Sequence, residues 1–223
     1  MTASTENPDG SDRVQPFFAQ VVGWDGMTVE ASATAIWGYP RRVRTFLPLI
    51  ISECEFPLGT AVPTPERTLY FHDGNNAEPC NAVAGQDADG DGKLSGGFGW
   101  LLSPGSCDAM HSSGTWESAD PGASPPDACD PGEMGLLVGD DIPLPIFDDL
   151  EGVGDGGRYH LSGFGLFHVT GYNFGGQYKA PDRQSAPCSG DERCISGYFT
   201  SGVVFDGDPG GVDRGFVIVK LTD

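Results

Sequence analysis

One short segment has residue types and spacing that suit a metal ion: "DADGDGKLSGGF", residues 87–98. The oxygen-bearing side chains occupy positions one, three, five and nine of an EF-hand-like loop, and they are Asp87, Asp89, Asp91 and Ser95. Position twelve, where a bidentate glutamate should stand, is Phe98, and no amphipathic helix pattern flanks the loop. We expect at most a weak Ca²⁺ site here; the alternative is a solvated acidic turn.

Two of the chain's four histidines, His160 and His168, lie in "YHLSGFGLFHVTGYNFGG", whose aromatic, small and β-branched residues are typical of a strand. On an unbroken strand they share one face and lie roughly 27 Å apart at about 3.4 Å per residue, too far to bind one metal. A bulge at Gly163 or Gly165 would change the face but not this conclusion. We interpret them as structural; a secreted hydrolase that uses either histidine with nearby acids is the alternative.

Nucleophile and phosphate motifs are absent. The chain has no GxSxG or SxxK pattern, and its glycine-rich "GFGLFHVTGYNFGG" lacks the lysine and the following helix of a phosphate loop. The sequence therefore predicts a protein that is not an enzyme, with no catalytic residue and no cofactor beyond the calcium candidate.

The cysteines carry a further kind of chemistry, because six of them in loop-like sequence, with no CxxC pair, indicate three disulfides and an oxidising compartment. Fifteen connectivities are possible. Closeness along the chain favours three of these pairs: Cys54–Cys80, Cys107–Cys129 and Cys188–Cys194.

Charge limits the partners. The net charge of −20 repels nucleic acid phosphates and anionic lipid headgroups.

No run of 18 apolar residues is present, and the N-terminus lacks the basic start and apolar middle of a signal peptide. Because the cysteines nevertheless indicate an oxidising compartment, we expect an exported domain whose leader or anchor lies outside this chain.

The elements that must position these groups are mostly strands. We expect a flexible polar lead over residues 1–13 and one β-rich domain over residues 14–223. It begins with a helix of about two turns within residues 14–24, because apolar residues recur at helical spacing after Pro16. The alternation of "MTVEASATAIWG" predicts a half-buried strand, "RTFLPLIISECEF" a buried strand or a short helix broken by Pro48, and "RTLYFHD" a strand.

Residues 74–139 read as a long loop region, stapled by cysteines and interrupted by one short strand in "GGFGWLLS". The C-terminal third predicts four strands of an antiparallel meander: "DIPLPIFDDLEG", "GRYHLSGFGLFHVTGYNFGG", "CISGYFTSGVVFDG" and "GFVIVKLTD". Pro143 and Pro145 place the first of them at a sheet edge. The predicted fold is mainly β: an antiparallel sheet or sandwich with a short N-terminal helix and long disulfide-stapled loops.

Several segments together resemble a known family. "VQPFFAQVVGWDGMTVEASATAIWG", "LPLIISECEF", "GGFGWLL" before Cys107, "LLVGDDIPLPIFDDLEGVGDGGRYHLSGFGLFHVTGY" and "CSGDERCISGYFTSGVVF" are similar in order and spacing to the extracytoplasmic part of actinobacterial TadE/TadG-like proteins of Flp (Tad) pilus assembly. The resemblance covers about residues 14–222. In that family an N-terminal transmembrane helix, absent from this chain, supplies the anchor.

The resemblance implies a non-catalytic, minor pseudopilin-like component that contacts other Tad proteins in the cell envelope, on the extracytoplasmic face of the membrane or at the cell surface. It would meet the membrane only through the anchor helix, and the six cysteines would be the family's stapling positions. The alternative is a secreted adhesin that binds a carbohydrate or a surface, with calcium as a candidate cofactor. Its exposed aromatic residues would include Trp100, Trp116 and Tyr172.

Overall fold

The computed structural model describes residues 33–72, 78–81, 93–152, 156–181 and 187–222, together with the two short strands at 13–14 and 27–28. Contacts divide the chain into two compact units, residues 1–36 with 220–223 and residues 37–219. In the first unit, β1 (Arg13–Val14) and β2 (Met27–Thr28) pair antiparallel. The second unit contains both hydrophobic cores.

Strands make up most of the regular structure, which confirms the predicted mainly β fold. Among the described residues there is a single α-helix, α1 (Pro131–Gly135). The further strands are β3 (Thr34–Gly38), β4 (Pro40–Thr45), β5 (Leu49–Ser52), β6 (Arg67–Tyr70), β7 (Cys80–Asn81), β8 (Lys93–Leu94), β9 (Phe98–Leu101), β10 (Ala109–Ser112), β11 (Trp116–Asp120), β12 (Asp141–Glu151), β13 (Arg158–Asn173), β14 (Cys194–Thr200), β15 (Gly202–Val204), β16 (Gly207–Pro209) and β17 (Phe216–Thr222).

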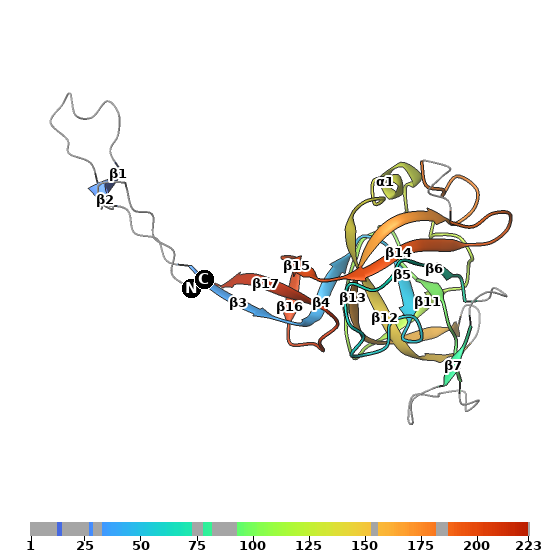
Figure 1. Cartoon of the computed structure of the whole chain (residues 1–223), viewed down its shortest axis with the longest axis horizontal. Coiled ribbons are helices and arrows are strands. Elements are labelled where there is room, and N and C mark those ends of the chain that lie inside the picture. The colour runs from blue at the N-terminus through green and yellow to red at the C-terminus, as the bar shows by residue number, and fades with distance from the viewer. Residues whose placement is uncertain are drawn as a thin grey trace. The chain divides into compact units, whose positions relative to one another are not determined.

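The largest sheet has the strand order β11-β9-β5-β12-β13-β14-β6 and closes on itself. Since β11 pairs with both β9 and β13, strands β9, β5, β12, β13 and β11 form a ring of hydrogen-bonded neighbours. At the other edge Phe71, next to β6, forms a parallel bridge with Phe98 of β9. Figure 1 shows β12, β13 and β14 as long arrows within this barrel-like body.

β12 lies inside this sheet, so the predicted edge position was wrong for the strand as a whole. It pairs with β13 along its length and with β5 only at Ile146 and Phe147. Pro143 and Pro145 lie before that contact. At these two residues the described pairings give β12 one neighbouring strand, β13. Residues two apart direct their nitrogens to the same side, so both prolines can face away from β13 without breaking a ladder bond.

The predicted meander is correct for three strands and wrong for the fourth. β12, β13 and β14 are consecutive antiparallel neighbours. β17 instead pairs parallel with β15, at Val217 and Val203, in a separate sheet of order β15-β17-β3. Between them the chain forms β16, which pairs with β4. This excursion lets β17 return in the same direction as β15, as a parallel pair requires.

The region 74–139 contains more regular structure than the sequence indicated. Besides β9, its described parts include β7, β8, β10, β11 and α1. β10 pairs with β4, and β11 with β9 and β13, so each short strand depends on a partner distant in the chain. Segments this short carry too few residues to show an alternation by themselves.

The predicted N-terminal helix lies outside the described residues, apart from Val14 of β1. The strand predicted in "MTVEASATAIWG" is described at its two ends, as β2 and β3. The half-buried character was wrong for β3, whose side chains are exposed from Thr34 to Trp37. The two segments predicted around Pro48 and at "RTLYFHD" form strands, with β4 and β5 on either side of the proline and β6 in the second segment.

Two hydrophobic cores lie on opposite sides of the sheet. Neighbouring β5 residues separate them: Leu49 and Ile51 pack in the first core, and Ile50 packs in the second, as expected for side chains that alternate along a strand. The first core is rich in aromatic rings and includes Phe98, Trp100, Phe167, Tyr172, Phe174 and Phe199. The second core includes Val43, Tyr159, Leu161, Phe164, Leu166 and Phe216.

β13 changes faces midway. Its second-core residues are odd-numbered before position 162 and even-numbered after it: Tyr159, Leu161, Phe164 and Leu166. The pairing with β12 skips Ser162, which is the extra residue of a β-bulge. His160 and His168 therefore fall on opposite faces, and the shared face expected for an unbroken strand was wrong.

Candidate functional site

Each histidine of β13 is held by an aspartate of β12. Nδ1 of His160 lies 2.6 Å from Oδ1 of Asp148, and Nδ1 of His168 lies 2.7 Å from Oδ1 of Asp141. The Asp148 side chain is 7% exposed, whereas that of Asp141 is 48% exposed. Both pairs connect the same two neighbouring strands, which favours the structural interpretation of the histidines.

The Asp148–His160 pair borders a pocket of about 460 Å³, which we call the polar pocket. Its polar side chains are those of Arg41, Glu53, Ser113, Asp148, His160, Ser162 and Arg214. Arg214, which is buried, donates from Nη2 to Oγ of Ser162 at 3.1 Å and lies 3.2 Å from Oε2 of Glu53. The Ser162 hydroxyl donates to the same Glu53 oxygen at 3.2 Å. Burial lowers the pKa of Arg214, while attraction to Glu53 and then to Asp148 opposes that shift.

These contacts bear on whether the Asp148–His160 pair has a hydroxyl beside it to activate. An aspartate on Nδ1 orients an imidazole, and such a pair serves catalysis when a hydroxyl or substrate meets the other nitrogen. Here the hydroxyl nearest in the chain, that of Ser162, is bonded to Glu53 and Arg214. The buried charges are thus matched with each other, as buried ion pairs require.

All three disulfides have the predicted pairing: Cys54–Cys80, Cys107–Cys129 and Cys188–Cys194. Among the described residues there is no free cysteine. Disulfides persist in oxidising compartments, so the domain belongs to an extracytoplasmic environment. The described residues contain no helix that is long and apolar enough to cross a membrane.

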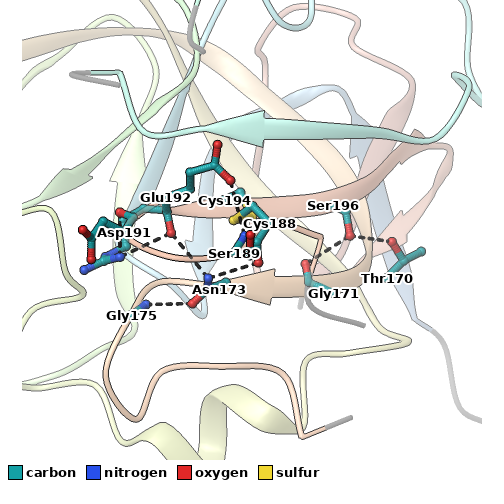
Figure 2. Close-up of a disulfide and its surroundings, with 11 residues drawn as sticks. Thr170, Gly171, Asn173, Gly175, Cys188, Ser189, Asp191, Glu192, Cys194 and Ser196 are labelled. Carbon is teal, nitrogen blue, oxygen red and sulfur yellow. Dashed lines mark hydrogen bonds between the residues drawn. A yellow bond between two sulfur atoms is a disulfide. The ribbon is translucent and has the colours of Figure 1, made fainter. Parts of the chain in front are cut away.

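Figure 2 shows how one buried amide secures the Cys188–Cys194 loop. Nδ2 of Asn173, at the end of β13, donates to the carbonyl oxygens of Cys188 at 3.2 Å and Glu192 at 3.4 Å. Its Oδ1 accepts from the backbone N–H of Gly175 at 3.1 Å. Both polar ends of the amide are satisfied, so this site acts as a structural clasp between β13 and the loop.

The Cys107–Cys129 disulfide borders a different kind of surface. Next to it, Oδ1 of Asp130 caps α1 by accepting from the backbone N–H groups of Gly132 and Glu133 at 2.8 and 3.1 Å. Beyond α1 the chain leaves Leu136 75% exposed. Leu136 lines a pocket of about 440 Å³ together with Phe46, which follows β4 and is 51% exposed. We call this pocket the α1 groove; its side chains include Phe46, Asp108, Asp130, Glu133, Leu136 and Leu137.

The α1 groove has an acidic lining. Three carboxylates line it: Asp108, Asp130 and Glu133. Among the described residues, no lysine or arginine lines it. Asp108 accepts from the hydroxyl of Ser106 and, at 2.5 Å, from Nη1 of Arg44. The Ser106 bond, followed by the Arg44 bond, lowers the pKa of Asp108 and keeps the carboxylate ionised. Arg44 also forms an ion pair with Asp206, with 2.8 Å between Nε and Oδ2.

The calcium candidate falls mainly outside the described residues. Asp87, Asp89 and Asp91 are not among them, and Ser95 lies just before β9. In the described ranges no group of three or more His, Cys, Asp or Glu side chains could hold a metal ion. Calcium binding by this loop therefore stays a prediction.

The aromatic residues named for an adhesin are not all exposed. Trp100 and Tyr172 are buried in the first core, so their expected exposure was wrong. Trp116 is partly exposed, beside the ring of His160 and below the guanidinium of Arg158. Four aromatic side chains that the sequence analysis did not name are also exposed: Trp37, Tyr39, Phe46 and Phe205. The adhesin alternative therefore stays a prediction.

The α1 groove was missed by the sequence reasoning, which treated its residues as part of a long loop. One signal could have indicated it: Met134, Leu136 and Leu137 interrupt the polar sequence after Cys129. Apolar residues beside a disulfide in a loop either bury themselves or form a surface for a partner. Here Met134 is buried and Leu136 is not.

No family model, no curated protein and no solved structure matches this chain.

Proposed function

We propose that this chain is the extracytoplasmic part of a TadE/TadG-like component of Tad pilus assembly, which acts through protein contacts in the cell envelope and not by catalysis. The resemblance of its segments to that family, in order and spacing, supports the identity. The three disulfides support the compartment, because an envelope protein folds where such bonds form.

The exposed apolar pair of the α1 groove carries the proposal of a contact function. Leu136 and Phe46 are large, exposed, and line the same pocket. Contiguous apolar surface on a soluble domain typically marks a site of protein interaction. The contacts in the polar pocket support the same view, because Arg214, Ser162 and Glu53 are bonded to one another.

The test is an in-frame deletion of the gene in its native host, with piliation scored by electron microscopy. We expect loss of pili and recovery with the wild-type gene. A photo-reactive amino acid at position 136 should cross-link to another pilus component, whereas one at Leu58, also exposed but outside the groove, should not. Normal piliation of the deletion strain would refute the proposed function.

A further inference from the structure

We infer that the α1 groove binds a segment of a partner protein in which an apolar side chain is flanked by lysine or arginine. The inference rests on the proposed function, since it names the chemistry of the partner at the same site. It adds a specific sequence character that the partner must have.

The apolar part of the inference comes from burial and size. Leu136 and Phe46 are 75% and 51% exposed, although Met134, which lines the same groove, is only 2% exposed. The volume of about 440 Å³ lies within the range of binding pockets, about 300–1,000 Å³. An inserted leucine or aromatic side chain would remove both exposed groups from water, which is favourable in proportion to the apolar area covered.

The basic part comes from the acidic lining. Asp108 is held by Arg44, and Asp130 caps α1, but among the described contacts Glu133 has no ion pair. Glu133 is therefore the carboxylate that a lysine or arginine can reach without displacing another bond. An acidic segment, a nucleic acid or an anionic lipid surface would meet like charge from a chain of net charge −20.

The disulfide makes the surface suited to binding. Cys107 lines the groove and is bonded to Cys129, which precedes the cap of α1. The two chain segments that border the groove are thus joined covalently. A pre-organised surface loses less conformational freedom when a partner binds.

The experiment uses the full chain and two short synthetic peptides with the same leucines, one with lysines and the other with glutamates at the remaining positions. Titration calorimetry at low and at physiological salt measures the dissociation constants. We expect the lysine peptide to bind the wild type and the glutamate peptide not to bind. Leu136→Ser should weaken binding about tenfold, and Glu133→Lys about fivefold.

Two control variants separate the groove from general effects. Val203→Ser removes an exposed apolar side chain that does not line the groove, and Asp191→Lys makes the same change in net charge at an exposed residue that does not line it either. Both should leave the dissociation constant within about twofold. Equal binding of the two peptides would overturn the inference, because the charge of the peptide would then play no part. Equal weakening by Asp191→Lys and Glu133→Lys would also overturn it, because binding would then follow the total charge and not the groove.

The peptide result is independent of the piliation test. If deletion abolishes pili but Leu136→Ser and Glu133→Lys bind the lysine peptide as the wild type does, the proposed function stands and the groove assignment fails. If the groove variants lose the peptide but the deletion strain keeps its pili, the groove assignment stands and the pilus function fails.

Discussion

The hydroxyl of Tyr159 and Nε2 of His72, 87 residues apart in the chain, share a hydrogen bond of 2.7 Å. Tyr159 lies on β13 and is 1% exposed. Tyr172, at the other end of the same strand, is 2% exposed, but its hydroxyl has no hydrogen-bond partner among the described residues. The strand thus carries two buried tyrosines in opposite hydrogen-bonding states.

Tyr159→Phe should therefore destabilise the protein more than Tyr172→Phe. The first change removes a bond and leaves the histidine nitrogen without it, at a cost of about 1–2 kcal/mol. The second removes a hydroxyl that gains nothing from burial, so the free energy of unfolding should stay within about 0.5 kcal/mol or rise. Urea unfolding of both variants measures this. A larger loss for Tyr172→Phe would contradict the assignment.

Alkaline pH should destabilise the domain through the same residues. Burial raises the pKa of Tyr159 and of Tyr172 above the ordinary value of 10.0. The unfolded chain therefore loses these protons first, and the stability present below pH 10 declines as the pH rises above it. Urea midpoints between pH 8 and pH 11 should show the decline, and Tyr159→Phe should make it shallower. An unchanged slope in that variant would exclude Tyr159 as a contributor.

Gly99→Ala should be strongly destabilising because β9 passes very close to this hydrogen bond. A Cβ atom at position 99 would lie 2.0 Å from the Tyr159 hydroxyl and 2.9 Å from Cδ2 of His72. Such overpacking costs about 1–3 kcal/mol. Adding Tyr159→Phe removes the nearest atom, so the double variant should lose less stability than the sum of the two single variants. Strict additivity in urea unfolding would contradict the contact.

Removing the Cys107–Cys129 disulfide should cost more stability than removing Cys188–Cys194. The first joins residues 22 apart and the second residues 6 apart. Loop-closure entropy then assigns about 3 kcal/mol to the first and about 2 kcal/mol to the second. Paired Cys→Ala variants in non-reducing urea titrations measure the difference. The reverse order would show that contacts such as those of Asn173 outweigh chain entropy.

Asp148→Asn should destabilise the domain by about 1–3 kcal/mol, whereas Asp141→Asn should cost less than about 1 kcal/mol. Both aspartates hold a β13 histidine, but the Asp148 side chain is buried and that of Asp141 is half exposed. Thermal unfolding of the matched pair measures the difference. If these histidines are structural, neither variant that still folds should lose piliation. Loss of piliation by a fully folded Asp148→Asn protein would reopen a chemical role for His160.

Local patterns were sufficient to predict some of the fold. The polar and aromatic alternation of β13 and the turn residues around β12 and β14 specify strands, because side-chain period and turn chemistry act within a few residues. Cysteine pairing was also predictable, since each bond joins neighbours along the chain. The candidate surface was not predictable in the same way, because its two exposed residues, Phe46 and Leu136, lie far apart in sequence.

By itself, the sequence determined a mainly β, acidic and disulfide-bonded domain, because composition, alternation and cysteine spacing are properties of short segments. Only the tertiary structure decided the bulge at Ser162 that turns His160 and His168 to opposite faces, and the parallel return of β17 beside β15. It also decided that Phe46 and Leu136 line one pocket while Met134 is buried. Register, strand partners and burial depend on contacts between distant segments, and those contacts form only when the whole sheet closes.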